Sequence, residues 1–179
     1  IKKICDVCNV DAGIDYRKRT LTAAQVYHTP NDEVAQNTLT QLFNSLAGNS
    51  EGKVLHIGHR DIKAIAFAGR VAWFDFNALC ATARSQTDYL ELIGRFDTLI
   101  VSDIPQMTAA MFSIARRFTW LIDVMYDHKI KLFISAQTPA TELYTEGQMA
   151  NEFFRTVSRL TEMQSQEYLE EEVIPVKFL

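Results

Sequence analysis

The chain has 179 residues, of which 47% are hydrophobic and 22% are charged, a balance typical of a globular protein and not of a disordered one. Its 18 basic and 22 acidic residues give a formal charge of −4, which argues against a dedicated nucleic-acid surface. No apolar run reaches the roughly 18 to 20 residues that a membrane-spanning helix needs, and three cysteines, an odd number, point to a reducing compartment.

The chain opens without an initiator methionine, and residues 4–10 read as a strand already under way. A strand at a terminus needs a sheet to join, so we expect the chain to be truncated from a larger protein. Residues 11–13 are expected to end this strand, and a polar connection to follow over 14–30. A helix is predicted over about 33–47, because apolar side chains recur there at helical spacing: Ala35, Leu39, Leu42 and Leu46.

Residues 48–52 are rich in glycine and polar residues, and they predict a linker with a domain boundary. Three short apolar runs follow at 54–57, 64–68 and 71–76. Turn residues separate these runs, so they predict an antiparallel meander.

The remainder alternates helices with buried strands. A helix over about 88–95 precedes the run 98–101, which is apolar throughout and typical of a strand covered on both faces. A long helix with an apolar face over 107–125, a buried strand at 131–135 and a last helix over about 149–170 follow. The predicted fold class is therefore α/β, with a parallel or mixed sheet flanked by helices.

Three short motifs imitate known signatures, but each lacks a feature that its signature requires. Residues 59–61 (HRD) lack the asparagine that a kinase catalytic loop carries five residues after its aspartate. Residues 48–54 have three residues between their glycines where a phosphate-binding loop has four, and Val54 replaces the magnesium-binding hydroxyl. Cys5 and Cys8 would point to opposite faces of the expected strand, so they are interpreted as buried cysteines and not as metal ligands.

The apolar strand that ends in Asp103 has the form of the magnesium-coordinating strand of nucleotide hydrolases. Those enzymes usually follow the aspartate with a glutamate that polarises the attacking water. Here Ile104 and Pro105 follow, so the favoured interpretation of Asp103 is a helix cap.

Longer segments together carry a family resemblance: 9–17 with 26–30, 83–89, 96–98 with 103–105, 115–118, 131–136 with Pro139 and 143–144, and above all SRLTEMQSQEYL at 158–169. They are similar to the ZapE family, a group of AAA-type P-loop ATPases that comprises a bacterial cell-division protein and mitochondrial relatives. The resemblance covers nearly the whole chain, and the opening segment is closer to the bacterial branch.

The resemblance implies that the chain is the C-terminal part of a P-loop NTPase, whose phosphate-binding loop and catalytic strand lie upstream. Residues 1–20 would then be the last strand and exit of the ATPase core, 21–52 a helix and linker, and 53–179 a C-terminal α/β domain. ATP and magnesium would act in the parent protein, and no catalytic or metal-binding residue is expected in this segment. Residues 96–144 also imitate a catalytic strand, helix and sensor strand, and a degenerate duplication of the core is one interpretation.

Two pairs of residues are candidates for contact with the nucleotide or with a neighbour. Tyr16 and Arg17 follow the expected final core strand, where such folds often contact the base or phosphates; a loop anchored by tyrosine packing is the alternative. Arg155 and Arg159 lie one turn apart, and either form ion pairs along their helix with Glu152 and Glu162 or reach a neighbouring subunit or its nucleotide.

Arg116 and Arg117 pose the same choice on the preceding long helix, with Asp123 and Asp127 further along it as possible ion-pair partners. By resemblance, the parent protein would be an ATP-driven regulator of bacterial cell division that acts on the FtsZ ring, in the cytoplasm and at the division site. This segment would pack against or regulate the N-terminal ATPase core of the same protein, with homo-oligomer formation left open and no nucleic-acid partner. The alternative is an independent, non-catalytic protein-interaction domain.

Overall fold

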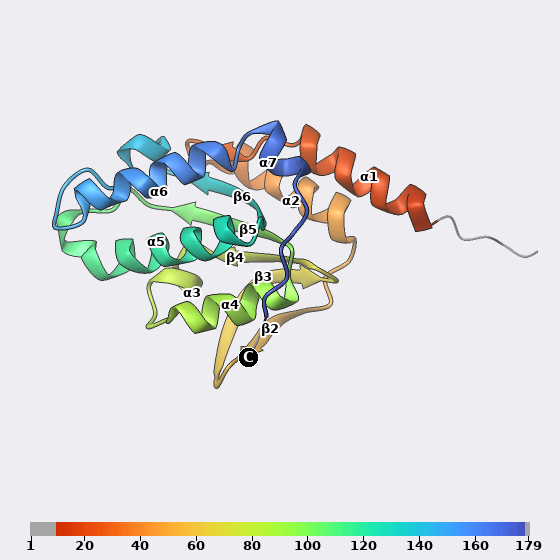
Figure 1. Cartoon of the computed structure of the whole chain (residues 1–179), viewed down its shortest axis with the longest axis horizontal. Coiled ribbons are helices and arrows are strands. Elements are labelled where there is room, and N and C mark those ends of the chain that lie inside the picture. The colour runs from red at the N-terminus through yellow and green to blue at the C-terminus, as the bar shows by residue number, and fades with distance from the viewer. Residues whose placement is uncertain (1–9, 178–179) are drawn as a thin grey trace, which may run out of the picture.

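A mixed sheet of six strands forms the centre of the molecule, in the order β1-β6-β5-β4-β3-β2 (Figure 1). The structure is a computed structural model that describes residues 10–177, with side chains from Tyr16 onward. The strands are β1 (Tyr27–His28), β2 (Gly52–Ile57), β3 (Arg60–Ala68), β4 (Val71–Asp75), β5 (Thr98–Ile104) and β6 (Lys131–Ala136). The helices are α1 (Val10–Ala23), α2 (Glu33–Ala47), α3 (Phe76–Cys80), α4 (Gln86–Arg95), α5 (Phe112–Asp127), α6 (Ala150–Glu162) and α7 (Gln166–Glu170).

The sheet joins a parallel half to an antiparallel half. β1, β6, β5 and β4 are parallel neighbours, whereas β4, β3 and β2 pair in antiparallel fashion. β6 is buried at every position, as a strand covered on both faces must be. The hairpin between β2 and β3 turns at Gly58, whose φ of 59° suits a residue without a side chain. The predicted α/β class with a mixed sheet is confirmed, and the meander lies where the apolar runs place it.

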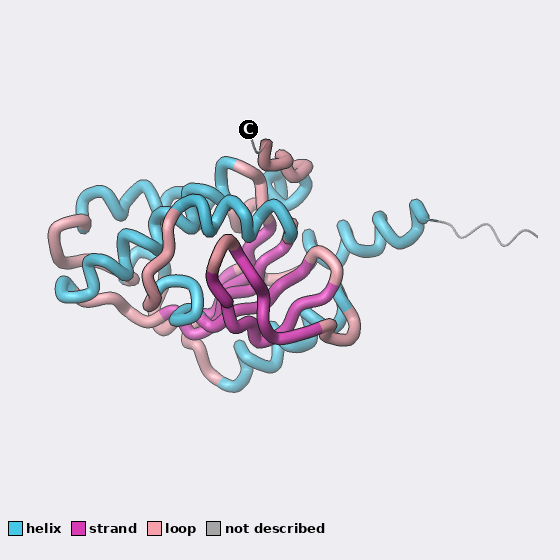
Figure 2. The backbone as a smooth tube through the Cα atoms, turned by 90° about the horizontal axis from the view of Figure 1, so that it is seen from below, coloured by secondary structure: helices cyan, strands magenta, loops and turns pink. Residues whose placement is uncertain are grey.

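Helices cover both faces of the sheet (Figure 2), and each face has its own core because side chains alternate along a strand. Phe74 and Val101 belong to the cluster that α4, α5 and α6 cover. Trp73 and Ile100 belong to the cluster on the opposite face, with α2 and the end of α1. Burial of each such side chain contributes about 1.5–3 kcal/mol, so both layers of helices are held to the sheet by apolar contact.

Residues 10–23 form the helix α1. The prediction that a strand ends at 11–13 is therefore wrong, and so is the prediction that an irregular polar connection begins at residue 14. The rest of the predicted first strand lies outside the described residues. A helix of 14 residues is marginal in water by itself. Tertiary contacts stabilise α1 here, because Leu21 is buried in the cluster that contains α2 and Arg17 forms an ion pair with Asp97. The first turns of α1 extend away from the sheet (Figures 1 and 2).

Residues 48–52, the predicted domain boundary, connect α2 to β2 within one packed unit. α2 contacts β4, β5 and β6, and the ring of Phe43 lies 6.3 Å from that of Trp73. The elements before and after the connection therefore share a core, because the apolar face of α2 is covered by the sheet that follows it. Gly48 ends α2 with a φ of 71°, as a helix-terminating glycine does.

The helix predicted over 149–170 is two helices, α6 and α7, with a turn between them. Ser165 caps α7 by accepting a hydrogen bond from the backbone N–H of Tyr168 at 3.2 Å. The turn directs Tyr168 into the core, where its hydroxyl lies 3.2 Å from the carbonyl oxygens of both Met125 and Ile130. The turn and the burial of this ring, which is 1% exposed, therefore occur together.

Candidate functional site

A topological switch lies between the neighbouring parallel strands β1 and β6. α2 follows β1 and packs on one face of the sheet, whereas α5 and α6 follow β5 and β6 and pack on the other. In open α/β sheets, ligands bind in the crevice that such a switch opens beyond the carboxyl ends of the strands. The residues at this edge are therefore the first candidates for a ligand site.

Hydrogen bonds between residues of the chain itself fill the place beyond the carboxyl ends of these strands. The carboxylate of Asp32 caps α2 by accepting from the backbone N–H of Ala35 at 2.9 Å. The side chain of Asn31 donates to Asp103 at 3.3 Å, and the N–H of Asp103 donates to the hydroxyl of Ser135 at 3.1 Å. Asp32 thus supplies an anion at the start of α2, where nucleotide-binding loops place a phosphate.

The helix-cap interpretation of Asp103 is wrong, because β5 continues past this residue to Ile104. Asp103 has a φ of 63°, a left-handed conformation that aspartate tolerates better than most residues. Its side chain is directed to the loop before α2 and not to the start of a following helix.

A second polar cluster lies at the other end of the parallel strands, where β5 and β6 begin. Asp97 accepts hydrogen bonds from Arg17 at 2.7 Å and from Arg70 at 3.0 Å. A cavity of about 400 Å³ lies beside it, between α1, α7 and the first residues of β5 and β6. Arg17 therefore anchors α1 to the body of the protein at this cavity, while Tyr16 beside it is 62% exposed.

Lys131 forms part of the cavity wall and is only 4% exposed. Its ammonium donates to the carbonyl oxygens of Tyr168 and Glu171, both at 2.7 Å. Burial lowers the pKa of Lys131 to about 8, against the opposing effect of the Glu171 carboxylate. The start of β6 thereby holds the end of α7 and the segment after it.

Between about pH 8 and 10.5, the stability of the protein should rise relative to a Lys131→Met variant. The pKa of Lys131 is about 8 in the folded chain, against an ordinary value of 10.5, so within this window the unfolded chain binds a proton that the folded chain does not. The relative free energy of unfolding should gain up to about 3 kcal/mol across the window and stay constant below it. Urea unfolding of both proteins at pH 7, 8, 9 and 10 measures this difference, and a difference independent of pH would contradict the shift.

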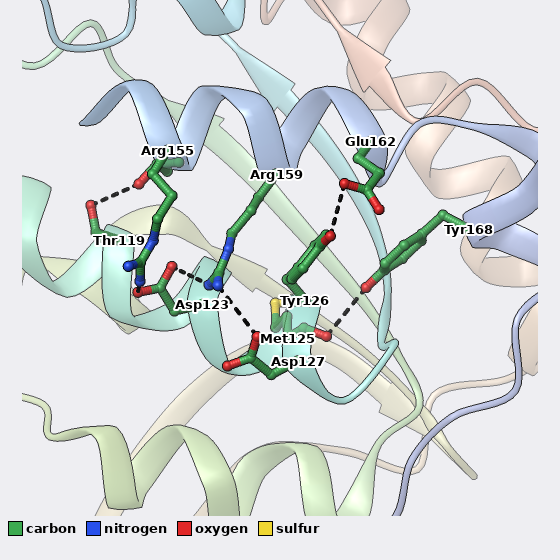
Figure 3. A network of polar contacts seen from close by, with 10 residues as sticks. Thr119, Asp123, Met125, Tyr126, Asp127, Arg155, Arg159, Glu162 and Tyr168 are labelled. Carbon is green, nitrogen blue, oxygen red and sulfur yellow. Dashed lines mark hydrogen bonds and ion pairs between the residues drawn. The ribbon is translucent and has the colours of Figure 1, made fainter. Parts of the chain in front are cut away.

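Arg155 and Arg159 of α6 both bind Asp123 of α5, one at each carboxylate oxygen (Figure 3). The side chain of Arg159 is 18% exposed and that of Arg155 is 63% exposed. Within the described part of the chain, this bridge between helices replaces the pairs predicted with Glu152 and Glu162 along α6. The two arginines lie one turn apart on the side of α6 that meets α5, so their shared carboxylate comes from the neighbouring helix.

The adjacent residues Arg116 and Arg117 have different environments. Arg117 donates through Nε to the carbonyl oxygen of Cys80 at 2.6 Å and so ties α5 to the end of α3. Arg116 is exposed, and its guanidinium lies 4.4 Å from the ring centroid of Phe112. The structure brings Arg116 and Arg155 to the wall of one hollow of about 590 Å³ between α5 and α6.

Asp97, Asp123 and Lys131 organise these clusters. Sequence reasoning gave no role to Asp97 or Lys131, and it considered Asp123 only as a partner for arginines of its own helix, whereas its partners are Arg155 and Arg159. Lys131 carried a usable signal, because a charged residue that opens an otherwise apolar strand needs a partner when it is buried. The arginine partners of Asp97 lie 80 and 27 residues away and those of Asp123 lie 32 and 36 residues away, and no local spacing indicates them.

Among the side chains that the structure describes, no group of three or more histidines, cysteines, aspartates or glutamates is placed to hold a metal ion. The described helices also include none that is long and apolar enough to cross a membrane. Cys5 and Cys8 lie outside the described residues, and Cys80 is buried as a free thiol.

Residues 1–172 match the family model of the AFG1-like ATPases. Cell division protein ZapE of Escherichia coli is 42% identical over 174 residues, which are 96% of this chain and 46% of that protein. Lactation elevated protein 1 homolog B of Danio rerio is 31% identical over 205 residues, covering 94% of this chain and 41% of the relative. An uncharacterised protein of Schizosaccharomyces pombe is 32% identical over 139 residues, covering 75% and 31%. No solved structure matches the chain.

The chain spans less than half the length of each of these relatives. Its mixed sheet flanked by helices is consistent with a P-loop NTPase family. The resemblance to the ZapE family that the motifs indicate is confirmed. With a family match over nearly its whole length, the chain belongs to the AFG1-like ATPase family.

Proposed function

We propose that the chain is the C-terminal portion of an ATPase that regulates cell division; its Escherichia coli relative is named as a cell division protein. The match to an ATPase family over residues 1–172 supports ATP and magnesium use by the parent protein. By the same resemblance, the partners are the N-terminal ATPase core of the same protein and FtsZ, in the bacterial cytoplasm and at the division site. The observation that carries the proposal is 42% identity to ZapE across 96% of the chain.

We also propose that the phosphate-binding loop for ATP lies in the parent's ATPase core and that this chain has no phosphate site of its own. The contacts at the switch point support this. A phosphate at the start of α2 would meet the carboxylate of Asp32, which already accepts from a helix N–H, and the exposed Asp103 beside it. Repulsion between like charges disfavours an anionic ligand at such a site.

Titration of the 179-residue chain with ATP and magnesium in a calorimeter should therefore give no saturable heat up to about 1 mM nucleotide. The complete protein that carries this chain should bind ATP under the same conditions and hydrolyse it, and it serves as the positive control. Micromolar binding of ATP by the chain itself would contradict the proposed absence of a phosphate site. Lack of hydrolysis by the complete protein would contradict the proposed ATPase.

Tyr16 and Arg17 remain proposed contacts to the nucleotide of the parent. Both lie on α1, whose first turns extend away from the sheet (Figure 1). Arg17 is also bonded to Asp97 at the cavity beside α7, so a movement of α1 would displace residues that line this cavity. Through this contact the segment could regulate the ATPase core as well as pack against it.

A non-catalytic interaction domain is the second candidate function. The hollow between α5 and α6 favours it, because Arg116 and Arg155 both line that hollow and neither is buried. ATP hydrolysis by the complete protein distinguishes this candidate from the first.

A further inference from the structure

α2 is a surface helix whose exposed side is almost free of charge. One side of the helix packs on the sheet, and the exposed residues on the other side are Glu33, Val34, Gln36, Asn37, Thr40, Gln41, Asn44 and Ser45. Glu33 is the first residue of the helix, and no charged residue follows it before Glu51. Over a similar length, α6 carries Glu152, Arg155, Arg159 and Glu162. Charged residues are depleted where a partner covers a protein surface, so α2 has the composition of a covered helix.

The hydroxyl groups along α2 can leave water at little cost. Those of Thr38, Thr40 and Ser45 each donate to the backbone carbonyl oxygen four residues earlier, at 2.8 Å. Burial of a polar group is costly where it leaves that group without a hydrogen bond, and these hydroxyls keep theirs inside the helix. A covering surface would therefore need polar groups mainly for the side-chain amides of Asn37, Gln41 and Asn44.

A hollow of about 350 Å³ adjoins this side of α2, between α2 and the end of α1. Its wall is formed by small and uncharged side chains, among them Ala23, Ala24, Thr38 and Ser45. His28 in the wall is 7% exposed, and burial lowers its pKa, so the ring is uncharged at neutral pH. The residues that line the hollow do not include the basic residues of α1: Arg17, Lys18 and Arg19. The hollow therefore suits an uncharged side chain.

We propose that the ATPase core of the parent protein packs on the α1–α2 surface, which consists of this hollow and the exposed side of α2 from Val34 to Ser45; the inference rests on the proposed function, which places the core before this chain. An apolar side chain of the core fills the hollow. Polar groups of the core bind the amides of Asn37, Gln41 and Asn44.

The size and the attachment of the core favour it as the occupant. The chain spans 46% of the length of Escherichia coli ZapE, so more than half of a protein of that size lies outside the structure. The end of α1 forms one wall of the hollow, and in the proposed parent the core is joined to the chain before α1. The core is thus held close to this surface at a high effective concentration.

The lack of charge also favours a contact within one protein. Charged groups at an interface mainly speed and select the encounter of separate molecules. Two parts of one chain do not need that selection, because their connection already brings them together. An uncharged surface therefore fits the core of the same protein better than it fits a transient partner.

The test uses the complete protein with single cysteines introduced at exposed positions, and it measures their labelling by a maleimide. Peptide mass spectrometry distinguishes each introduced cysteine from the natural ones, and labelling in urea gives its intrinsic rate. Val34→Cys and Ser45→Cys should be labelled at least about tenfold more slowly in the folded protein than in urea, because the core covers them. Phe154→Cys is the matched control, since Phe154 is 71% exposed, as Val34 is, and it should be labelled at similar rates in both conditions.

A charged variant tests whether the surface must be uncharged. Gln41→Glu adds a carboxylate at the hollow and should raise the labelling rate of Ser45→Cys at least about fivefold, because an unpaired charge weakens the contact. A nearby carboxylate raises the pKa of a thiol and would by itself slow labelling, so a faster rate reports on the contact. Gln164→Glu, at an exposed glutamine beyond α6, is the control and should leave the rate unchanged.

Three results would overturn the inference. The first is similar labelling of Val34→Cys, Ser45→Cys and Phe154→Cys in the folded protein, and the second is no effect of Gln41→Glu. The third is protection that disappears when the protein is diluted to a monomer, since a second copy would then be the occupant. ATP hydrolysis is measured on the same samples. Hydrolysis without protection would overturn this contact alone, whereas protection without hydrolysis would support the contact and overturn the proposed ATPase.

Discussion

Replacing Asp123 with alanine is expected to lower the free energy of unfolding by about 2–4 kcal/mol. The carboxylate is 14% exposed and is held by Arg155 and Arg159 from the neighbouring helix. Its removal leaves the guanidinium of Arg159, 18% exposed, without its principal partner at the contact between α5 and α6 (Figure 3). A charge desolvated in this way is costly, so the loss should exceed that of a surface ion pair. Urea unfolding followed by circular dichroism measures it.

Asp127→Ala is the matched control, because this aspartate lies one turn further along α5, is 61% exposed and is 3.4 Å from Arg159. Its loss should be less than about 0.5 kcal/mol. A double-mutant cycle between Asp123→Ala and Arg159→Ala should give a coupling free energy of about 1–3 kcal/mol. Equal losses for the two aspartates would show that the bridge from Asp123 to α6 contributes no more to stability than an exposed ion pair does.

The central elements of the fold could be predicted because their patterns are local. Residues 99–101 and 132–134 are apolar throughout, and a strand covered on both faces requires that pattern. α2 could be predicted from apolar side chains at helical spacing and from the glycine that ends it. These elements are determined by residues within a few positions of one another, so sequence reasoning places them well.

α1 and the break before α7 depend on distant residues and escaped prediction. α1 is held by Asp97, 80 positions from Arg17, and nothing near residue 17 indicates that partner. The turn before α7 exists because Tyr168 reaches carbonyl groups of residues 125 and 130. Local propensity has no access to such contacts, and tertiary interactions override it.

The candidate site shows the same division. Sequence reasoning pointed to Arg116, Arg117, Arg155 and Arg159 from their positions on two predicted helices, but it did not indicate which of these are exposed. The structure separates Arg117 and Arg159, which are partly buried and bind partners within the fold, from the exposed Arg116 and Arg155, which line an open hollow. Arg155 also binds Asp123 from this exposed position. Periodicity places a residue on a side of a helix, whereas the neighbouring helix decides whether its charge is satisfied.

Replacing Tyr168 with alanine should have the largest effect of the substitutions considered, a loss of about 3–5 kcal/mol in the free energy of unfolding. The side chain is 1% exposed, and its ring stacks on that of Tyr126 with centroids 5.9 Å apart. The ammonium of Lys131 lies 5.0 Å from the same ring and donates to the carbonyl of residue 168. Alanine would therefore leave a cavity and weaken the attachment of α7 to β6.

Tyr168→Phe separates packing from hydrogen bonding. It keeps the ring and removes only the hydroxyl that lies 3.2 Å from the carbonyl oxygens of Met125 and Ile130, so the expected loss is about 1–2 kcal/mol. Tyr126→Phe is the control, because its hydroxyl bonds the exposed Glu162 at 2.8 Å and should contribute less than about 1 kcal/mol. Thermal and urea unfolding should rank the three losses as Tyr168→Ala, Tyr168→Phe and Tyr126→Phe. If phenylalanine at 168 cost as much as alanine, packing of the ring would not be what holds α7 in place.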